Sequence, residues 1–194
     1  MEAALRWSPH ATNDRGRFLQ VNVSNPGIVL NQIDSFDKNS VSYHTVSQSG
    51  KLPSFGAFDQ SKTDESILAV GLLSGNASLV KLIDDAKGSN EPEMTFRIKQ
   101  QRKCNSISFS SEDWLAVALD RTRSDVSLNV YDAKSEASEP VRRLCAAELV
   151  SSVRFFPNQP QQLVAAVQRS HIRLYDLRGM LDHYSQVTSF SLQY

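Results

Sequence analysis

Several features that mark other classes of protein are scarce in this sequence. Among 194 residues there are only two cysteines, Cys104 and Cys145, which fits reduced thiols better than a disulfide framework. The longest uninterrupted run of apolar residues and glycine, 67–73, is far shorter than the roughly 18 residues that cross a bilayer. Near the N-terminus, Glu2 stands where a secretory signal has basic residues. We therefore expect a cytoplasmic protein without direct membrane insertion.

An excess of charge of one sign is also missing. Lys and Arg number 21, Asp and Glu number 21, and the formal net charge is zero. Because the charges balance, no overall electrostatic field attracts nucleic acid or an anionic membrane surface. Binding to either would need a local patch of positive charge. Two basic clusters, 99–103 and Arg142-Arg143, are predicted to be solvated surface. We expect no nucleic-acid partner.

The residue patterns of known catalytic and metal sites are absent. The four histidines fall in four unrelated contexts, without the spacing of metal ligands: His10, His44, His171 and His183. There is no nucleophile elbow and no glycine-rich phosphate loop. The acidic pairs Asp84-Asp85 and Glu112-Asp113 are expected in solvated loops. The sequence thus predicts no catalytic residue, no cofactor and no metal site.

What the sequence does contain is a repeat. Its apolar residues come in short runs rich in Val, Leu, Ile and Phe, broken by Ser, Asn, Asp, Gly and Pro, and this pattern predicts an all-β fold. One such run begins at positions 18, 68, 115 and 163, so its separations are 50, 47 and 48 residues. A period of this length is typical of propellers and other repeat architectures.

Each repeat unit has room for four strands. A strand ending in an aromatic residue precedes the apolar run and an alternating strand follows it, while polar stretches between the units supply the fourth: 41–46, 95–98 and 141–144. Such units, closing on Tyr131-Asp132 and Tyr175-Asp176 where Trp-Asp is usual, predict a WD-repeat β-propeller. We expect a partial propeller of about four blades in an open arc, with no second domain. The predicted units are 1–46, 53–98, 104–144 and 150–194.

The residue types agree with stacked blades. A middle strand such as 115–118 is continuously apolar because neighbouring blades are expected to cover both of its faces. The aromatic residues Trp7, Phe109 and Phe155 are predicted to fill the interfaces between blades as ordinary core residues.

Several stretches, taken in order, resemble the N-terminal propeller of the Mios family, which are WD-repeat subunits of the SEA/GATOR assembly. The stretches are 5–10, 67–71 followed by 74–76, and above all 104–107 leading into 114–128. The resemblance covers most of this chain but only a small part of a family member, which looks like a complete propeller followed by an α-solenoid and a zinc-binding RING-like module. We therefore expect the sequence to be a truncated or partial product.

The resemblance implies a non-catalytic scaffold whose partners are other protein subunits of the SEA/GATOR complex. It further implies a role in amino-acid signalling to the target-of-rapamycin kinase, with peripheral association through partners at the vacuolar or lysosomal membrane. Two alternatives stay open. One is a generic WD-repeat adaptor, such as a ubiquitin-ligase receptor or a coat subunit. The other is an enzymatic propeller, such as a hydrolase or lactonase, with metal-binding acids and histidines lining its central channel.

One turn stands out within the segment that carries the resemblance. It holds Asp120, Arg121, Arg123 and Asp125 between two predicted strands. In WD repeats an aspartate at this turn commonly braces the blade through bonds from its side chain to the backbone. Exposed loop arginines are also good anchors for a partner protein. We expect bracing as the main role and keep partner contact as the alternative.

Overall fold

The computed structural model describes residues 4–12, 15–22, 26–37, 40–84, 91–168 and 170–178, together with the backbone of 186–191. Within this part the chain forms sixteen strands and no helix, so the predicted all-β class is confirmed. It accordingly includes no helix long and apolar enough to cross a membrane. Two residues discussed above, Asp85 and His183, lie outside the described residues.

The strands form four antiparallel sheets, each with its four strands paired in chain order. The first sheet contains β1 (Leu5–Trp7), β2 (Arg17–Asn22), β3 (Gly27–Asp37) and β4 (Ser40–Gln48). The second contains β5 (Phe55–Gln60), β6 (Ile67–Leu72), β7 (Ala77–Lys81) and β8 (Met94–Phe96). The third contains β9 (Cys104–Phe109), β10 (Trp114–Leu119), β11 (Val126–Asp132) and β12 (Arg142–Ala146). The fourth contains β13 (Val150–Phe156), β14 (Gln159–Val167), β15 (His171–Asp176) and β16 (Gln186–Ser191).

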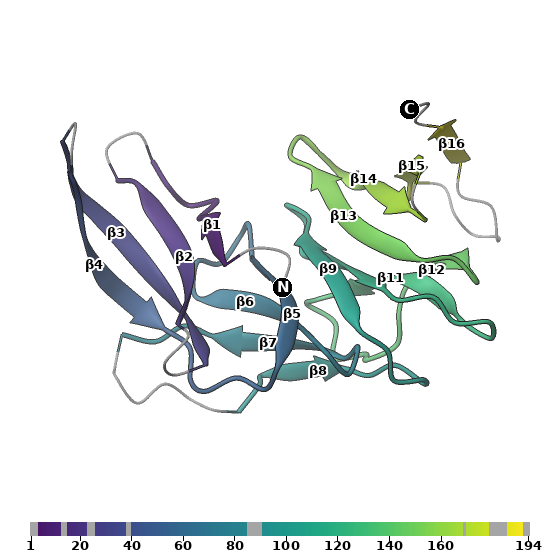
Figure 1. Ribbon diagram of the computed structural model, residues 1–194, viewed down its shortest axis with the longest axis horizontal. Coiled ribbons are helices and arrows are strands. Elements are labelled where there is room, and N and C mark those ends of the chain that lie inside the picture. Colours follow the sequence, from purple (N-terminus) through teal and green to yellow (C-terminus); the bar gives the residue numbers. More distant parts are fainter. Residues whose placement is uncertain are drawn as a thin grey trace.

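The sheets stand side by side in an open arc, as expected from the sequence (Figure 1). The first strand of each sheet faces the inside of the arc, and β9 contacts both β5 and β13. Because the strands of each sheet are antiparallel and paired in chain order, successive connections along the chain alternate between two edges of the arc. We call the edge with the turns from first to second strand the front edge, and the edge with the turns from second to third strand the back edge.

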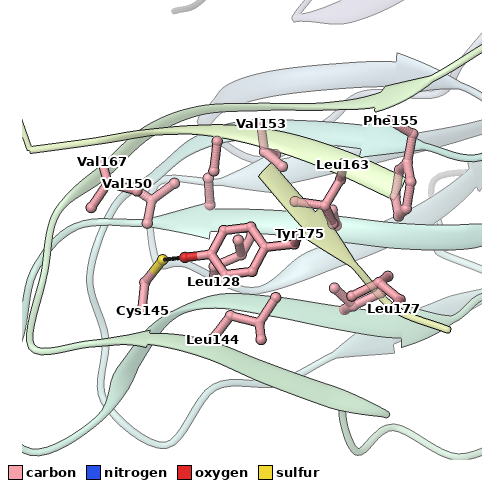
Figure 2. Packing of buried hydrophobic residues seen from close by; sticks show 14 residues of the cluster. Leu128, Leu144, Cys145, Val150, Val153, Phe155, Leu163, Val167, Tyr175 and Leu177 are labelled. Atoms are coloured by element: carbon pink, nitrogen blue, oxygen red, sulfur yellow. Dashed lines mark hydrogen bonds between the residues drawn. The ribbon is translucent and has the colours of Figure 1, made fainter. Parts of the chain in front are cut away.

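The core lies between neighbouring sheets. Residues of the third and fourth sheets pack together around Tyr175, as Figure 2 shows. In β10, Leu115, Val117 and Leu119 pack toward the second sheet, whereas Ala116 and Ala118 pack toward the fourth. All five residues are buried, which confirms the prediction that a middle strand is covered on both faces. A fully buried leucine or valine stabilises the fold by about 1.5–3 kcal/mol.

A close approach between the second and third sheets explains one glycine. A Cβ added at Gly71 would lie 2.3 Å from the Sγ atom of Cys104. Because Cys104 is fully buried and cannot move outward, only glycine fits at this position. The Cys-Asn segment that carries the family resemblance therefore begins with an interface residue between two sheets.

Two predictions about individual side chains are wrong. Phe109 and Phe155 are buried as expected, but Trp7 is 66% exposed. It stacks edge-on against Phe18, on the face of the first sheet that points away from the second. Asp113 is expected to be solvated but is only 5% exposed. Its turn packs against the 61–66 loop of the second sheet, and the Thr63 hydroxyl donates a hydrogen bond to its carboxylate.

Candidate functional site

The predicted site is the connection between β10 and β11, which we call the Asp120–Asp125 turn. It lies on the back edge of the arc, next to two connections that join one sheet to the next, 97–103 and 147–149. The turn therefore lies beside the connection from the second sheet to the third and the connection from the third sheet to the fourth. Its four candidate residues divide into two aspartates and two arginines with different environments.

Asp125 carries a paired carboxylate that is largely shielded from solvent. Its side chain is 9% exposed and forms ion pairs with Arg102, at 3.1 Å, and with Arg143. The Val126 N–H also donates to it at 2.8 Å. Burial by itself raises the pKa of Asp125, but these donors outweigh it, so the pKa lies below the ordinary value. The carboxylate is thus ionised at neutral pH and holds the turn in place.

Arg102 corrects a third expectation. The basic cluster 99–103 was predicted to be solvated, yet the side chain of Arg102 is only 6% exposed. Besides Asp125, it donates to the carbonyl oxygen of Val126 at 2.6 Å. The signal that could have found this pair is weak, because Arg102 and Asp125 stand 23 residues apart in two different connections.

Asp120 braces the other end of the turn. Its Oδ1 accepts a hydrogen bond from the Asn105 amide at 2.8 Å. The same amide donates at 3.1 Å to the carbonyl oxygen of Val150, the first residue of the fourth sheet. Asn105 thereby links the Asp120–Asp125 turn to the neighbouring sheet, a role that the sequence did not reveal.

The two arginines of the turn point to solvent. Arg121 and Arg123 are exposed, and within the described part of the chain neither guanidinium has a hydrogen bond or an ion pair. Arg121 borders a depression shared with Leu149 and Gln168, and Arg123 borders a second one shared with Arg143. All four predicted residues thus lie in one turn. Its two aspartates are held by hydrogen bonds or ion pairs, and its two arginines are exposed to solvent.

The described residues offer no assembly for metal chemistry. Among them, no group of three or more His, Cys, Asp and Glu side chains is placed to hold a metal ion. The Nε2 atom of His10 lies 2.8 Å from the carbonyl oxygen of Ser61, and Nδ1 of His44 lies 2.6 Å from Asp34. His10 lies in the turn after β1, and His44 is an exposed residue of β4.

Comparison with solved structures identifies the architecture. The crystal structure of the Myceliophteria thermophila Cps50 (Swd1) β-propeller domain superimposes with a TM-score of 0.55 at 15% identity, over 73% of this chain and 38% of that chain. The fold is that of a WD β-propeller. The predicted fold class is confirmed, and the four sheets are henceforth called blades 1 to 4.

Sequence comparison finds relatives among WD-repeat proteins, although no protein-family model matches the chain. An uncharacterised WD repeat-containing protein of Schizosaccharomyces pombe is 26% identical over 180 residues, which are 90% of this chain and 19% of that protein. The GATOR2 complex protein MIOS of Danio rerio is 26% identical over 141 residues, which are 59% of this chain and 16% of that protein. MIOS-A of Xenopus laevis is 25% identical over 143 residues, again 59% and 16%. The chain thus spans less than a fifth of the length of these relatives.

Proposed function

We propose that this chain is a non-catalytic WD-repeat scaffold, part of one propeller, that acts in a complex of the SEA/GATOR type. The observation that carries the proposal is the Asp120–Asp125 turn. Its two aspartates are held by the blade, and its two arginines, Arg121 and Arg123, are exposed. A rigid turn loses little conformational freedom on binding, so its arginines suit a protein interface.

The choice of complex is supported by two relatives. Both vertebrate proteins are named as GATOR2 complex proteins, and each matches 59% of this chain. If the chain shares their assembly, it acts in amino-acid signalling to the target-of-rapamycin kinase. Its association with the vacuolar or lysosomal surface is then peripheral and depends on its partner subunits.

A second candidate function is an adaptor of a different complex. It is favoured by the S. pombe relative, which matches 90% of this chain and whose name mentions WD repeats without assigning a complex. Both candidate functions require the same fold, but they imply different partner proteins.

Affinity capture of the full-length gene product from its own cells, followed by mass spectrometry, separates the two candidates. We expect GATOR2 subunits to be captured, and we expect the double variant Arg121→Glu/Arg123→Glu to lose most of them. The matched control is Arg15→Glu, an exposed arginine on the front edge of blade 1. Capture of a different complex would support the adaptor. If the double variant retained all GATOR2 subunits, the Asp120–Asp125 turn would not be part of the interface with them.

A further inference from the structure

A concavity of about 600 Å³ lies inside the arc, where the first strands of all four blades converge. It opens on the front edge, opposite the Asp120–Asp125 turn, and it is lined by the ends of β1, β5, β9 and β13 with the turns that follow them. None of the four residues of the predicted site borders it. It is therefore a separate surface that the scaffold proposal does not use.

The charges around this concavity are unbalanced. Arg6, Lys62 and Arg154 line it, and Asp59 is the one acidic residue among its lining residues. The acceptors of Asp59 are already engaged, since Oδ1 accepts from Arg6 at 3.0 Å and Oδ2 accepts from the Phe109 N–H at 2.8 Å. In a chain of zero net charge this local excess of cations creates a positive potential that favours an anionic ligand.

The cations differ in how firmly they are held. Arg154 is half-buried, and its Nη1 donates to the carbonyl oxygen of Val153 at 2.7 Å and to the Ser106 hydroxyl at 3.0 Å. This arginine is a fixed charge in the wall of the concavity. Lys62 is 33% exposed, and its Nζ lies 3.7 Å from Asp59, which is a loose contact. A flexible lysine at this distance is able to turn toward a ligand at little cost.

Large apolar side chains also border the concavity. Trp7 is 66% exposed and Phe156 is 38% exposed, and both line the concavity together with Pro9 and Pro157. The ring of Trp7 is oriented by its edge-on contact with Phe18, with centroids 6.4 Å apart. Exposed aromatic residues that are held in one orientation are typical anchors of protein interfaces.

We propose that this concavity binds an acidic peptide segment of a partner protein. Carboxylates of the segment lie near Lys62 and Arg154, and an apolar side chain packs on Trp7 and Phe156. A peptide is favoured over nucleic acid because the chain has a formal net charge of zero and so offers no extended positive surface to a phosphate backbone. It is favoured over a lipid headgroup because an apolar side chain of a peptide can pack on the aromatic residues beside the cations. The inference holds for any partner complex, so it stands or falls separately from the proposed GATOR2 role.

The test is fluorescence anisotropy with the 194-residue chain. The probe is a short fluorescein-labelled peptide that alternates Glu with Leu and Phe, and the comparison peptide has every Glu replaced by Lys. We expect the acidic peptide to bind, its affinity to fall as salt is added, and the basic peptide to bind at least about tenfold more weakly, equivalent to about 1.4 kcal/mol.

Variants locate the binding surface. We expect Lys62→Glu and Trp7→Ala each to weaken binding of the acidic peptide about tenfold. Lys62→Arg keeps the charge and is expected to retain binding, and Arg15→Glu, on the same edge but outside the concavity, is the control. Circular dichroism confirms that each variant is folded, which these exposed positions allow.

Three results would overturn the proposal. The first is absence of binding of the acidic peptide, and the second is binding that Lys62→Glu and Trp7→Ala leave unchanged. The third is tighter binding of a single-stranded RNA oligonucleotide or of phosphoinositide-containing vesicles, lost in Lys62→Glu, because it would assign the concavity to another class of anion.

Discussion

Blades 1 and 3 have the same four-stranded topology but very different surroundings. Blade 3 has a neighbour on each face, and the β10 residues from Leu115 to Leu119 are at most 1% exposed. Blade 1 has blade 2 on one face, while its other face carries a row of aromatic rings, Trp7, Phe18 and Tyr43, of which the two outer ones are largely exposed. Whether a strand becomes part of the core therefore depends more on coverage by a neighbouring blade than on the strand itself.

Blade 4 extends the same lesson at the other end of the arc. In blade 3, Ala116 pairs with Val130 and Ala118 pairs with Leu128, and all four residues are buried against blade 4. The corresponding positions of blade 4 pair in the same register, and they are only half-buried: Val164 with Leu174, and Ala166 with Ile172. Equivalent apolar faces are thus covered or partly open according to their place in the arc.

The largest expected effect comes from truncating a side chain in the doubly covered blade. Leu115→Ala removes a fully buried leucine from the interface between blades 2 and 3, and we expect it to lower the free energy of unfolding by about 2–5 kcal/mol. The matched change on the open face, Tyr43→Ala, is expected to cost less than about 1 kcal/mol. Urea unfolding followed by circular dichroism measures both. Equal losses would contradict the comparison.

A smaller effect is expected at the braced turn. Asp125→Asn keeps the size of the side chain but removes the charge that pairs with Arg102 and Arg143, so we expect a loss of about 1–3 kcal/mol. Glu136→Gln, at an exposed position of the same blade, is the control and should stay within about 0.5 kcal/mol of the unmodified chain. An Asp125→Asn variant as stable as this control would show that the ion pairs of Asp125 with Arg102 and Arg143 make no net contribution to stability.

The contribution of Asp125 should also depend on pH. Because its pKa is lowered in the folded state, its stabilisation is fully present above the unfolded pKa of about 3.8, and is lost as pH falls through the lower folded pKa. The difference in unfolding free energy between the unmodified chain and Asp125→Asn should therefore be constant near neutrality and shrink below about pH 4. If the difference grew as the pH fell, ionised Asp125 would not be the stabilising form.

The smallest effect is expected inside the interface between blades 3 and 4. Tyr175 Oη lies 2.7 Å from Sγ of the buried Cys145 (Figure 2). Burial raises the pKa of both groups, so they stay protonated and form a neutral pair. Tyr175→Phe keeps the ring packed and removes the contacts of the hydroxyl with Cys145 and with Arg173, and we expect a loss of about 0.5–1.5 kcal/mol in the same unfolding assay. A loss as large as that of Leu115→Ala would mean that this contact is a main determinant of the interface.

The fold could be predicted from the sequence because each repeat unit is defined by residues that are close together along the chain. Apolar runs at a near-constant spacing and the turns between them define each four-stranded unit without knowledge of distant contacts. The prediction failed where the outcome depends on which segment stands alongside. Trp7 is exposed because it lies on the open face of blade 1, and Asp113 is buried because a loop of blade 2 covers it. Arg102 is buried because Asp125 reaches it from another connection.

Native-state amide hydrogen exchange reports the stability of each strand separately, so it shows whether coverage by neighbouring blades sets the stability of a strand. If coverage by neighbouring blades sets stability, amides of β9 and β10 in blade 3 should exchange most slowly, and those of β1 and β4 in blade 1 should exchange much faster. Uniform protection across the blades, or slower exchange in blade 1 than in blade 3, would contradict the account.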